Sequence, residues 1–199
     1  MELSKKMGIA LLMLGLSANA FSDDKADLLT IIRAQAGQYN EFKELLNSPD
    51  QSLRIAAFDG MVNSGDPALR DIAIDEALAN ADVTMQSLAF REVIMGLDSV
   101  NFAMTLPDNA SENTKKNITA WGGAYFLKLS KKDKKLGQFS GGSTDFKNSM
   151  KGNISGLELS FVSKVCSGKA SLVDGAVLQG VISCDGRITE PTTITSKIR

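Results

Sequence analysis

Three acidic residues, Asp71, Asp75 and Glu76, are close enough in sequence to do chemistry together. On a helix, positions 71 and 75 lie on one face because they are four residues apart. Paired carboxylates can act as general acid and base, or bind calcium. The segment has no Asp-x-Asp-x-Asp-Gly calcium loop, and a solvated helix face explains the same pattern. A carboxylate-based hydrolase is therefore the last of the functions considered.

The sequence contains no histidine among its 199 residues. This excludes Ser-His-Asp and Cys-His catalysis and removes the commonest zinc ligand. No other motif indicates a metal site or a prosthetic group. The sequence thus predicts no catalytic residue, no metal ligand and no cofactor.

Two cysteines, Cys166 and Cys184, are expected to form a disulfide in an oxidising compartment. Between them, Asp174-Gly175-Ala176 separates two segments in which small or apolar residues alternate with polar ones. A three-residue hairpin loop there places Cys166 opposite Cys184 and gathers the apolar residues on one face. Opposed strand residues lie within disulfide reach. The sequence therefore predicts a hairpin joined by a disulfide.

Five lysines form a cationic segment within eight residues: Lys128, Lys131, Lys132, Lys134 and Lys135. Such a cluster attracts phosphates or carboxylates in a salt-dependent way, although a solvated turn has the same composition. The arginines and interleaved aromatic residues of a nucleic-acid platform are missing. We therefore expect no nucleic-acid partner, and either a solvated turn or a site for an anionic polymer.

Residues 1–20 have the features of a secretory signal peptide. Lys5 and Lys6 precede an apolar run over 7–16, and Ala18 and Ala20 fit an A-x-A cleavage site. The run is shorter than the roughly 20 residues that span a bilayer, and no later segment is apolar enough to do so. The alternative is a buried N-terminal helix. We expect a periplasmic or secreted protein without a transmembrane segment.

A repeat with a period of 16 residues begins near residue 48. An aspartate starts each unit, where it would cap a helix and complement its dipole. The leucine, alanine and large apolar residue that follow would share one buried face. The repeated positions are Asp50, Asp66 and Asp82; Leu53, Leu69 and Met85; Arg54, Arg70 and Gln86; Ala57, Ala73 and Ala89; and Phe58, Ile74 and Phe90.

Residues 48–97 resemble HEAT-type helical repeats. The resemblance lies in Ser48-Pro49-Asp50…Leu53-Arg54…Ala57 and in Gly65-Asp66-Pro67…Leu69-Arg70…Ala73. It implies a curved stack of helices that binds proteins and catalyses no reaction. Members of that family use about 40 residues per two-helix repeat, so the present spacing is tight. A small helical bundle with repeated caps is the alternative.

Charge and periodicity divide the chain into two halves. Residues 21–110 contain 6 basic and 15 acidic side chains, a net charge of −9, and residues 111–199 contain 14 and 7, a net charge of +7. The predicted fold class is α+β, with an all-helical repeat-like domain over 21–105 and a linker over 106–117. A small antiparallel β-sandwich or partial barrel with one disulfide follows over 118–199. Since surface ion pairs are weak and screened by salt, we expect the halves to separate at high salt.

The second half is expected to contain short strands joined by polar turns. The pattern predicts a strand over 124–129, a charged turn over 131–135 and a flexible loop over 139–143. Alternation over 157–161 predicts a half-buried strand. The tail, residues 187–199, is either an edge strand or disordered.

These features favour an exported, non-enzymatic protein-interaction module of the bacterial envelope, such as an inhibitor, a toxin-immunity protein or an assembly adaptor. Its partner would be another protein, bound at the acidic helical face. The first alternative is a binding module for an anionic envelope polymer, which would bind the five lysines. The carboxylate-based hydrolase comes third.

The first prediction concerns processing. Cleavage after Ala20 would give a mature protein that begins at Phe21. Intact-mass measurement of the exported protein should find this N-terminus, and retention of Met1 would contradict the prediction.

Overall fold

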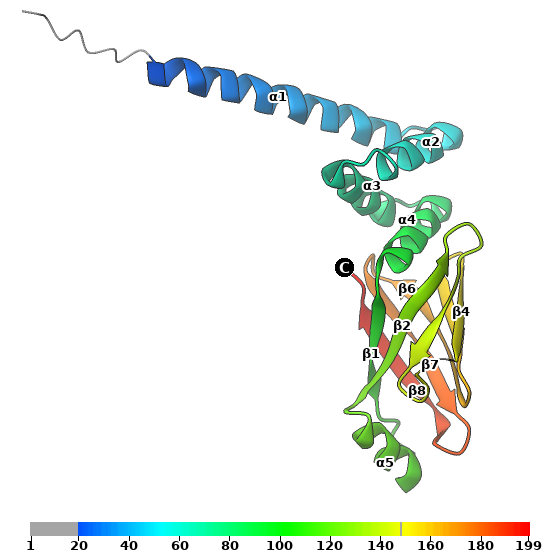
Figure 1. Cartoon of the computed structure of the whole chain (residues 1–199). Coiled ribbons are helices and arrows are strands. Elements are labelled where there is room, and N and C mark those ends of the chain that lie inside the picture. Colours follow the sequence, from blue (N-terminus) through cyan, green and yellow to red (C-terminus); the bar gives the residue numbers. More distant parts are fainter. Residues whose placement is uncertain (1–19, 148) are drawn as a thin grey trace, which may run out of the picture. The chain divides into compact units, whose positions relative to one another are not determined.

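The computed structural model describes residues 20–147 and 149–199. The predicted signal peptide therefore lies outside the described residues except for Ala20, where the first helix begins. Contacts divide the chain into two units, residues 1–40 and 41–199, and α1 belongs to both. The elements drawn in Figure 1 are α1 (Ala20–Leu46), α2 (Gln51–Val62), α3 (Pro67–Ala79), α4 (Val83–Gly96), β1 (Ser99–Thr105), α5 (Glu112–Ala120), β2 (Ala124–Asp133), β3 (Gln138–Ser143), β4 (Met150–Ser155), β5 (Glu158–Val162), β6 (Cys166–Val173), β7 (Val177–Cys184) and β8 (Ile188–Lys197).

Helix α1 is one continuous helix through Gly37. Apolar side chains on its N-terminal part are exposed by 49–56%: Leu28, Leu29, Ile31 and Ile32. Near its C-terminal end, Leu46 is buried and Phe42 packs against the core of residues 41–199. The helix thus changes from exposed to packed along its length.

Helices α2, α3 and α4 begin in the same way, as the repeat predicted. The carboxylates of Asp50, Asp66 and Asp82 each accept a hydrogen bond of 2.8 Å from a backbone N–H in the first turn. These bonds satisfy donors that a helix start leaves unpaired. The backbone N–H of each aspartate in turn donates to the side-chain oxygen two residues earlier, which belongs to Ser48, Ser64 and Asn80.

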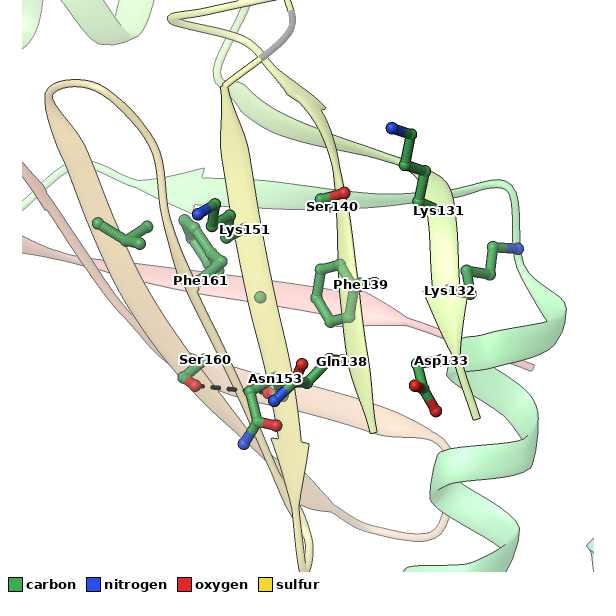
Figure 2. Close-up of a pocket in the computed structure, with 12 residues that line it drawn as sticks. Lys131, Lys132, Asp133, Gln138, Phe139, Ser140, Lys151, Asn153, Ser160 and Phe161 are labelled. Carbon is green, nitrogen blue, oxygen red and sulfur yellow. Dashed lines mark hydrogen bonds between the residues drawn. The ribbon is translucent and has the colours of Figure 1, made fainter. Parts of the chain in front are cut away.

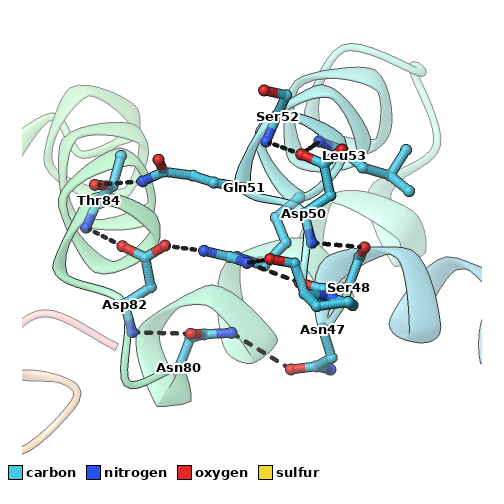
Figure 3. A network of polar contacts seen from close by, with 11 residues as sticks. Asn47, Ser48, Asp50, Gln51, Ser52, Leu53, Asn80, Asp82 and Thr84 are labelled. Atoms are coloured by element: carbon cyan, nitrogen blue, oxygen red, sulfur yellow. Dashed lines mark hydrogen bonds and ion pairs between the residues drawn. The ribbon is translucent and has the colours of Figure 1, made fainter.

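A polar network joins the starts of α2 and α4 (Figure 3). Arg54 donates to the carbonyl of Ser48 at 2.7 Å and forms an ion pair with Asp82. Gln51 donates to the hydroxyl of Thr84 at 3.2 Å. The hydrogen bond from Arg54 holds the pKa of Asp82 below its usual value. Alternate helices of the repeat are therefore linked through their caps.

Burial of the repeat increases towards the barrel. Ala73 and Ala89 are fully buried, as the predicted helix contacts require. At the leucine position, however, Leu53 of α2 is 42% exposed, whereas Met85 of α4 is fully buried. Helix α4 packs against α3 and also contacts the barrel region, where its Glu92 pairs with Lys134 beyond β2 at 2.9 Å.

The eight strands form a closed antiparallel barrel in chain order, in which β8 pairs with both β7 and β1. The predicted α+β class and antiparallel strands are confirmed. The sequence predicted either a sandwich or a partial barrel, and the structure shows a closed barrel. The tail is the closing strand and neither an edge strand nor disordered. Its inward side chains provide the reason, since Ile188, Thr192 and Ile194 are buried.

The predicted hairpin is confirmed in its register. Cys166 lies opposite Cys184 and Val173 opposite Val177, and the two cysteines are disulfide-bonded. The intervening loop is Asp174 to Ala176, with φ of 48° at Asp174 and 65° at Gly175. Aspartate and glycine are among the residues that tolerate this left-handed conformation.

Aromatic rings fill the barrel interior. The ring of Phe161 stacks on those of Tyr125 and Phe102, with centroids 5.5 Å and 6.1 Å away. Glycines on the inner face make room for the rings: a Cβ at Gly152 would lie 2.1 Å from Phe139, and Gly168 is similarly placed against Phe161. This interior is a packed core of the kind expected in an eight-stranded barrel.

The helical segment ends earlier than the predicted boundary at 105. Asp98 lies one period after Asp82, where a fourth cap would be, but the chain enters β1 at Ser99. There Val100, Phe102 and Met104 alternate inward, and the backbone carbonyl of Asp98 accepts from Leu129 of β2 at 2.8 Å. This alternation of buried side chains is typical of a strand. It follows directly on the helical repeat, and the predicted helical domain therefore extended too far.

The expected linker, 106–117, contains the start of α5. Ser111 caps this helix, and Glu190 of β8 accepts hydrogen bonds from Ser111, at 3.3 Å, and from Thr114. Hydrogen bonds, first of all the one from Thr114, lower the pKa of Glu190 to about 2. Since α4 precedes β1 and α5 follows it, the two helices lie at opposite ends of the barrel (Figure 1).

Two further expectations are wrong in the same region of the barrel. Lys131 and Lys132 belong to β2 and not to a turn, and residues 139–143 lie in β3 and not in a flexible loop. The glycines that suggested a loop are required by close backbone approaches. A Cβ at Gly141 would lie 1.9 Å from the carbonyl oxygen of Lys128.

One buried apolar cluster extends from Leu46 to Ile198 and includes residues of α2, α3, α4 and all eight strands. The helices and the barrel of residues 41–199 thus share a core. This shared cluster argues against the expected separation at high salt, because apolar burial is not screened by salt. In the described part of the chain, no helix is both long and apolar enough to cross a membrane.

The shared core predicts cooperative unfolding. Replacing Cys166 and Cys184 by alanine should lower stability by about 3 kcal/mol on the chain-entropy model. Circular dichroism of the helices and fluorescence of Trp121, beside the barrel, should give the same lowered midpoint. Loss of the barrel signal while α2–α4 remain folded would contradict a common core.

Candidate functional site

The five predicted lysines do not form one cluster. Lys132 donates to the carbonyl of Leu97 at 2.6 Å, and Lys134 pairs with Glu92 at 2.9 Å. Both side chains therefore hold the β2–β3 end of the barrel to the end of α4. Lys135 is exposed near them, whereas Lys128 and Lys131 lie on the outer barrel surface.

The three predicted carboxylates are bound within the chain. Arg199 pairs with Asp75 at 2.7 Å and with Asp71 at 3.3 Å. Lys43 pairs with Glu76 at 2.8 Å, and this hydrogen bond lowers the pKa of Glu76. Within the described residues, no group of three or more acidic or cysteine side chains could hold a metal ion. The acidic face is therefore occupied by basic side chains of the same protein.

Four lysines surround a pocket of about 560 Å³ on the outer face of β2, β3 and β4. Lys128 and Lys131 come from β2, Lys151 comes from β4, and Lys147 precedes β4. We call this the lysine pocket. Its other lining residues are Ser130, Ser140, Gly141, Ser149 and Met150.

A β-bulge makes this arrangement possible. Lys128 and Lys131 are three residues apart, so a regular strand would point them to opposite faces. The register of β2 against β3 shifts between Leu129 and Lys131, leaving Ser130 as the extra residue. An extra residue reverses the alternation, and both lysines consequently reach the outer face.

A second pocket of about 790 Å³ adjoins the first and shares Lys131, Ser140 and Lys151 with it. These three are cross-strand neighbours in one row. Two residues further along the strands, the next row of outward-facing residues is Asp133, Gln138, Asn153 and Ser160. We call this second site the amide pocket, and Figure 2 shows the row of Lys131, Ser140 and Lys151 above the row of Asp133, Gln138, Asn153 and Ser160.

The lysine pocket has a strong positive charge without local compensation. Among the described residues, Lys128, Lys131, Lys147 and Lys151 form no ion pair, and no carboxylate lines this pocket. Four like charges around one concave surface raise the local concentration of anions. The serine hydroxyls between them can donate further hydrogen bonds to an anion.

A separate carboxylate, Asp145, links three segments at one end of the barrel. It accepts hydrogen bonds from Tyr125, from Ser143 at 2.7 Å and from Ser163 at 2.5 Å. Burial raises the pKa of Asp145, but the three hydroxyl donors outweigh burial, and the net pKa is below its usual value. Burial and the bond to Asp145 raise the pKa of the Tyr125 phenol. A carboxylate with a lowered pKa is a weak general base. We therefore interpret the cluster as structural: its hydrogen bonds hold the three segments together.

The sequence pattern indicated only two of the four lysines of the lysine pocket, and few residues of the amide pocket. Lys147 and Lys151 lie outside the lysine-rich segment, and Gln138 and Asn153 are isolated polar residues. The alternation Lys151, Asn153 against buried Met150 and Ile154 is a weak strand signal. Recognising 139–143 as a strand would have placed these residues beside β2.

The Asp145 cluster predicts a pH-dependent contribution to stability. At pH 7, Asp145→Asn should lower the free energy of unfolding by about 1–2 kcal/mol, since it weakens charge-assisted hydrogen bonds at a partly exposed site. The lowered folded-state pKa makes this contribution complete above the unfolded value near 4, and it is lost as pH falls through the folded value. In denaturant titrations, the difference in free energy of unfolding between wild type and variant should be smaller at pH 3 than at pH 7. Asp174→Asn, in an exposed turn, is the control, and an equal effect from it would contradict the assignment.

Comparison of the chain with protein-family models, curated proteins and solved structures finds no match. The resemblance of residues 48–97 to HEAT-type repeats therefore stays a prediction. No family is assigned to the barrel or the helices, and the function must be inferred from the chemistry of the protein's own surfaces.

Proposed function

We propose that this protein is an exported, non-enzymatic binding protein that holds an anionic polymer of the bacterial envelope in its lysine pocket. The observation that supports this most directly is the convergence of Lys128, Lys131, Lys147 and Lys151 on one concave surface without a carboxylate partner. Positive charges arranged along a groove bind polymers better than single ions because a polymer supplies several charges at once.

The use of other charges inside the molecule supports the same proposal. Lys132 and Lys134 bind groups of α4 and its C-terminal turn, and Arg199 binds Asp71 and Asp75. Within residues 20–147 and 149–199, four cations gather around the lysine pocket without such a role. A carboxylate-based hydrolase has less support, since Asp71 and Asp75 share their basic partner with each other.

Export is supported by the disulfide between Cys166 and Cys184 and by the signal-peptide pattern of residues 1–20. Disulfides persist in the periplasm and outside the cell, and they are rare in the cytosol. The proposed location is therefore periplasmic or secreted.

A protein-interaction module is the second candidate, and the exposed apolar side chains of α1 favour it. Leu28, Leu29, Ile31 and Ile32 are each about half exposed, and clustered exposed apolar residues are typical of interaction sites. An inhibitor, an immunity protein or an adaptor could bind there. The acidic helical face, which the sequence suggested for this role, has less support because its carboxylates are already paired. Binding through α1 would persist at high salt, whereas binding in the lysine pocket would weaken.

Binding of sulfated dextran and of neutral dextran of the same length tests the first candidate. The full mature protein should bind the sulfated polymer, with affinity that falls as salt rises, and should not bind the neutral one. Replacing Lys128, Lys131, Lys147 and Lys151 together by glutamine should weaken binding roughly thirtyfold, since each exposed charge contributes about 0.5 kcal/mol.

A second variant controls for net charge. Glutamine at four exposed lysines outside the two pockets changes the total charge by the same amount, and it should change affinity by less than about threefold. The four positions are Lys115, Lys116, Lys135 and Lys197. Equal losses in the two variants would mean that overall charge, and not the lysine pocket, is responsible.

A further inference from the structure

The amide pocket offers a hydrogen-bonding surface directly beside the lysine pocket, with two amides, a hydroxyl and one carboxylate in its outer row. Its outward row lies two residues along the strands from the shared row of lysines, a distance of about 7 Å. Gln138, Asn153 and Ser160 are neighbours on three consecutive strands. Figure 2 shows them together at the end of the view away from Lys131 and Lys151.

The side-chain amides of Gln138 and Asn153 form no hydrogen bond within the described residues, although the backbone carbonyl of Asn153 accepts from Ser160. Each amide supplies two donors and a carbonyl acceptor. Asp133 adds acceptor oxygens to the same row. Groups that both donate and accept, such as the hydroxyls of a sugar, match this set, whereas a bare phosphate or carboxylate chain offers acceptors alone.

The amide pocket also has apolar lining residues. Besides Lys132, its remaining lining residues are Phe139, Gly152, Phe161 and Val162, and Val162 is 53% exposed. Sugar rings present C–H groups on their faces and hydroxyls at their edges. A surface that combines an exposed apolar side chain with a row of amides is therefore complementary to a sugar ring.

We propose that the bound polymer is an acidic polysaccharide. Its charged groups lie in the lysine pocket, and the hydroxyls of the adjoining sugar bond to Gln138, Asn153 and Ser160. The inference rests on the proposed function and adds the chemical class of the ligand. The lysines supply attraction, and the amide row distinguishes a saccharide from a polyanion without hydroxyls.

Two carboxylated polymers of similar length test the inference: polygalacturonate, which carries hydroxyls, and polyacrylate, which carries no hydrogen-bond donor once ionised. With the full mature protein, the double variant Gln138→Ala and Asn153→Ala should lose about tenfold in affinity for polygalacturonate and keep its affinity for polyacrylate. The lysine variant described above should lose affinity for both. Asn101→Ala with Gln179→Ala removes two exposed amides from β1 and β7, and this control should change neither affinity.

The outcomes separate the inference from the proposed function. If the amide variant binds polygalacturonate as tightly as wild type, or loses both polymers equally, the ligand class is wrong and the lysine pocket stands. If wild type binds neither polymer, both proposals fail. Thermal unfolding of each variant checks that the barrel is intact, which is expected because the substituted side chains face outward.

Discussion

The pairing of β1 with β8 closes the sheet, and most other features of residues 41–199 depend on that closure. An eight-stranded barrel has an interior just wide enough for side chains, and here aromatic rings occupy it. The lysine pocket and the amide pocket accordingly lie on the outer surface, where every second residue of each strand points. Closure also forces the sheet to curve, and bulges such as the one at Ser130 accommodate that curvature while they redirect side chains.

The opposite charges of the two halves have an internal use. Contacts of Arg199 with Asp71 and Asp75, and of Lys134 with Glu92, join basic residues of the barrel region to acidic residues of the helices. Each exposed pair contributes little, and one apolar cluster includes buried residues of both the helices and the strands. The ion pairs instead favour one orientation of the helices on the barrel.

Sequence predicted the features that depend on neighbouring residues. The aspartate caps and the register of Cys166 against Cys184 follow from local turn chemistry and from alternation. The lysine pocket could not be predicted in the same way, since it needs β3 between β2 and β4 and a bulge that the lysine spacing does not reveal. Lys132 shows the difference: its sequence neighbours suggest a solvated turn, whereas the carbonyl of Leu97, distant in sequence, determines its position.

Asp98 occupies the cap position of the 16-residue period at the entrance to β1. The helices therefore meet the barrel in phase with their own repeat. Each unit brings its own aspartate cap and its own alanine, which is buried in α3 and α4 and partly buried in α2, and it packs against its sequence neighbours. Tandem duplication of one unit would consequently preserve both the entry into β1 and the packing of α4. The number of helices between Leu46 and the barrel can thus change by one unit at a time, in evolution or in protein engineering, without changes to the strands.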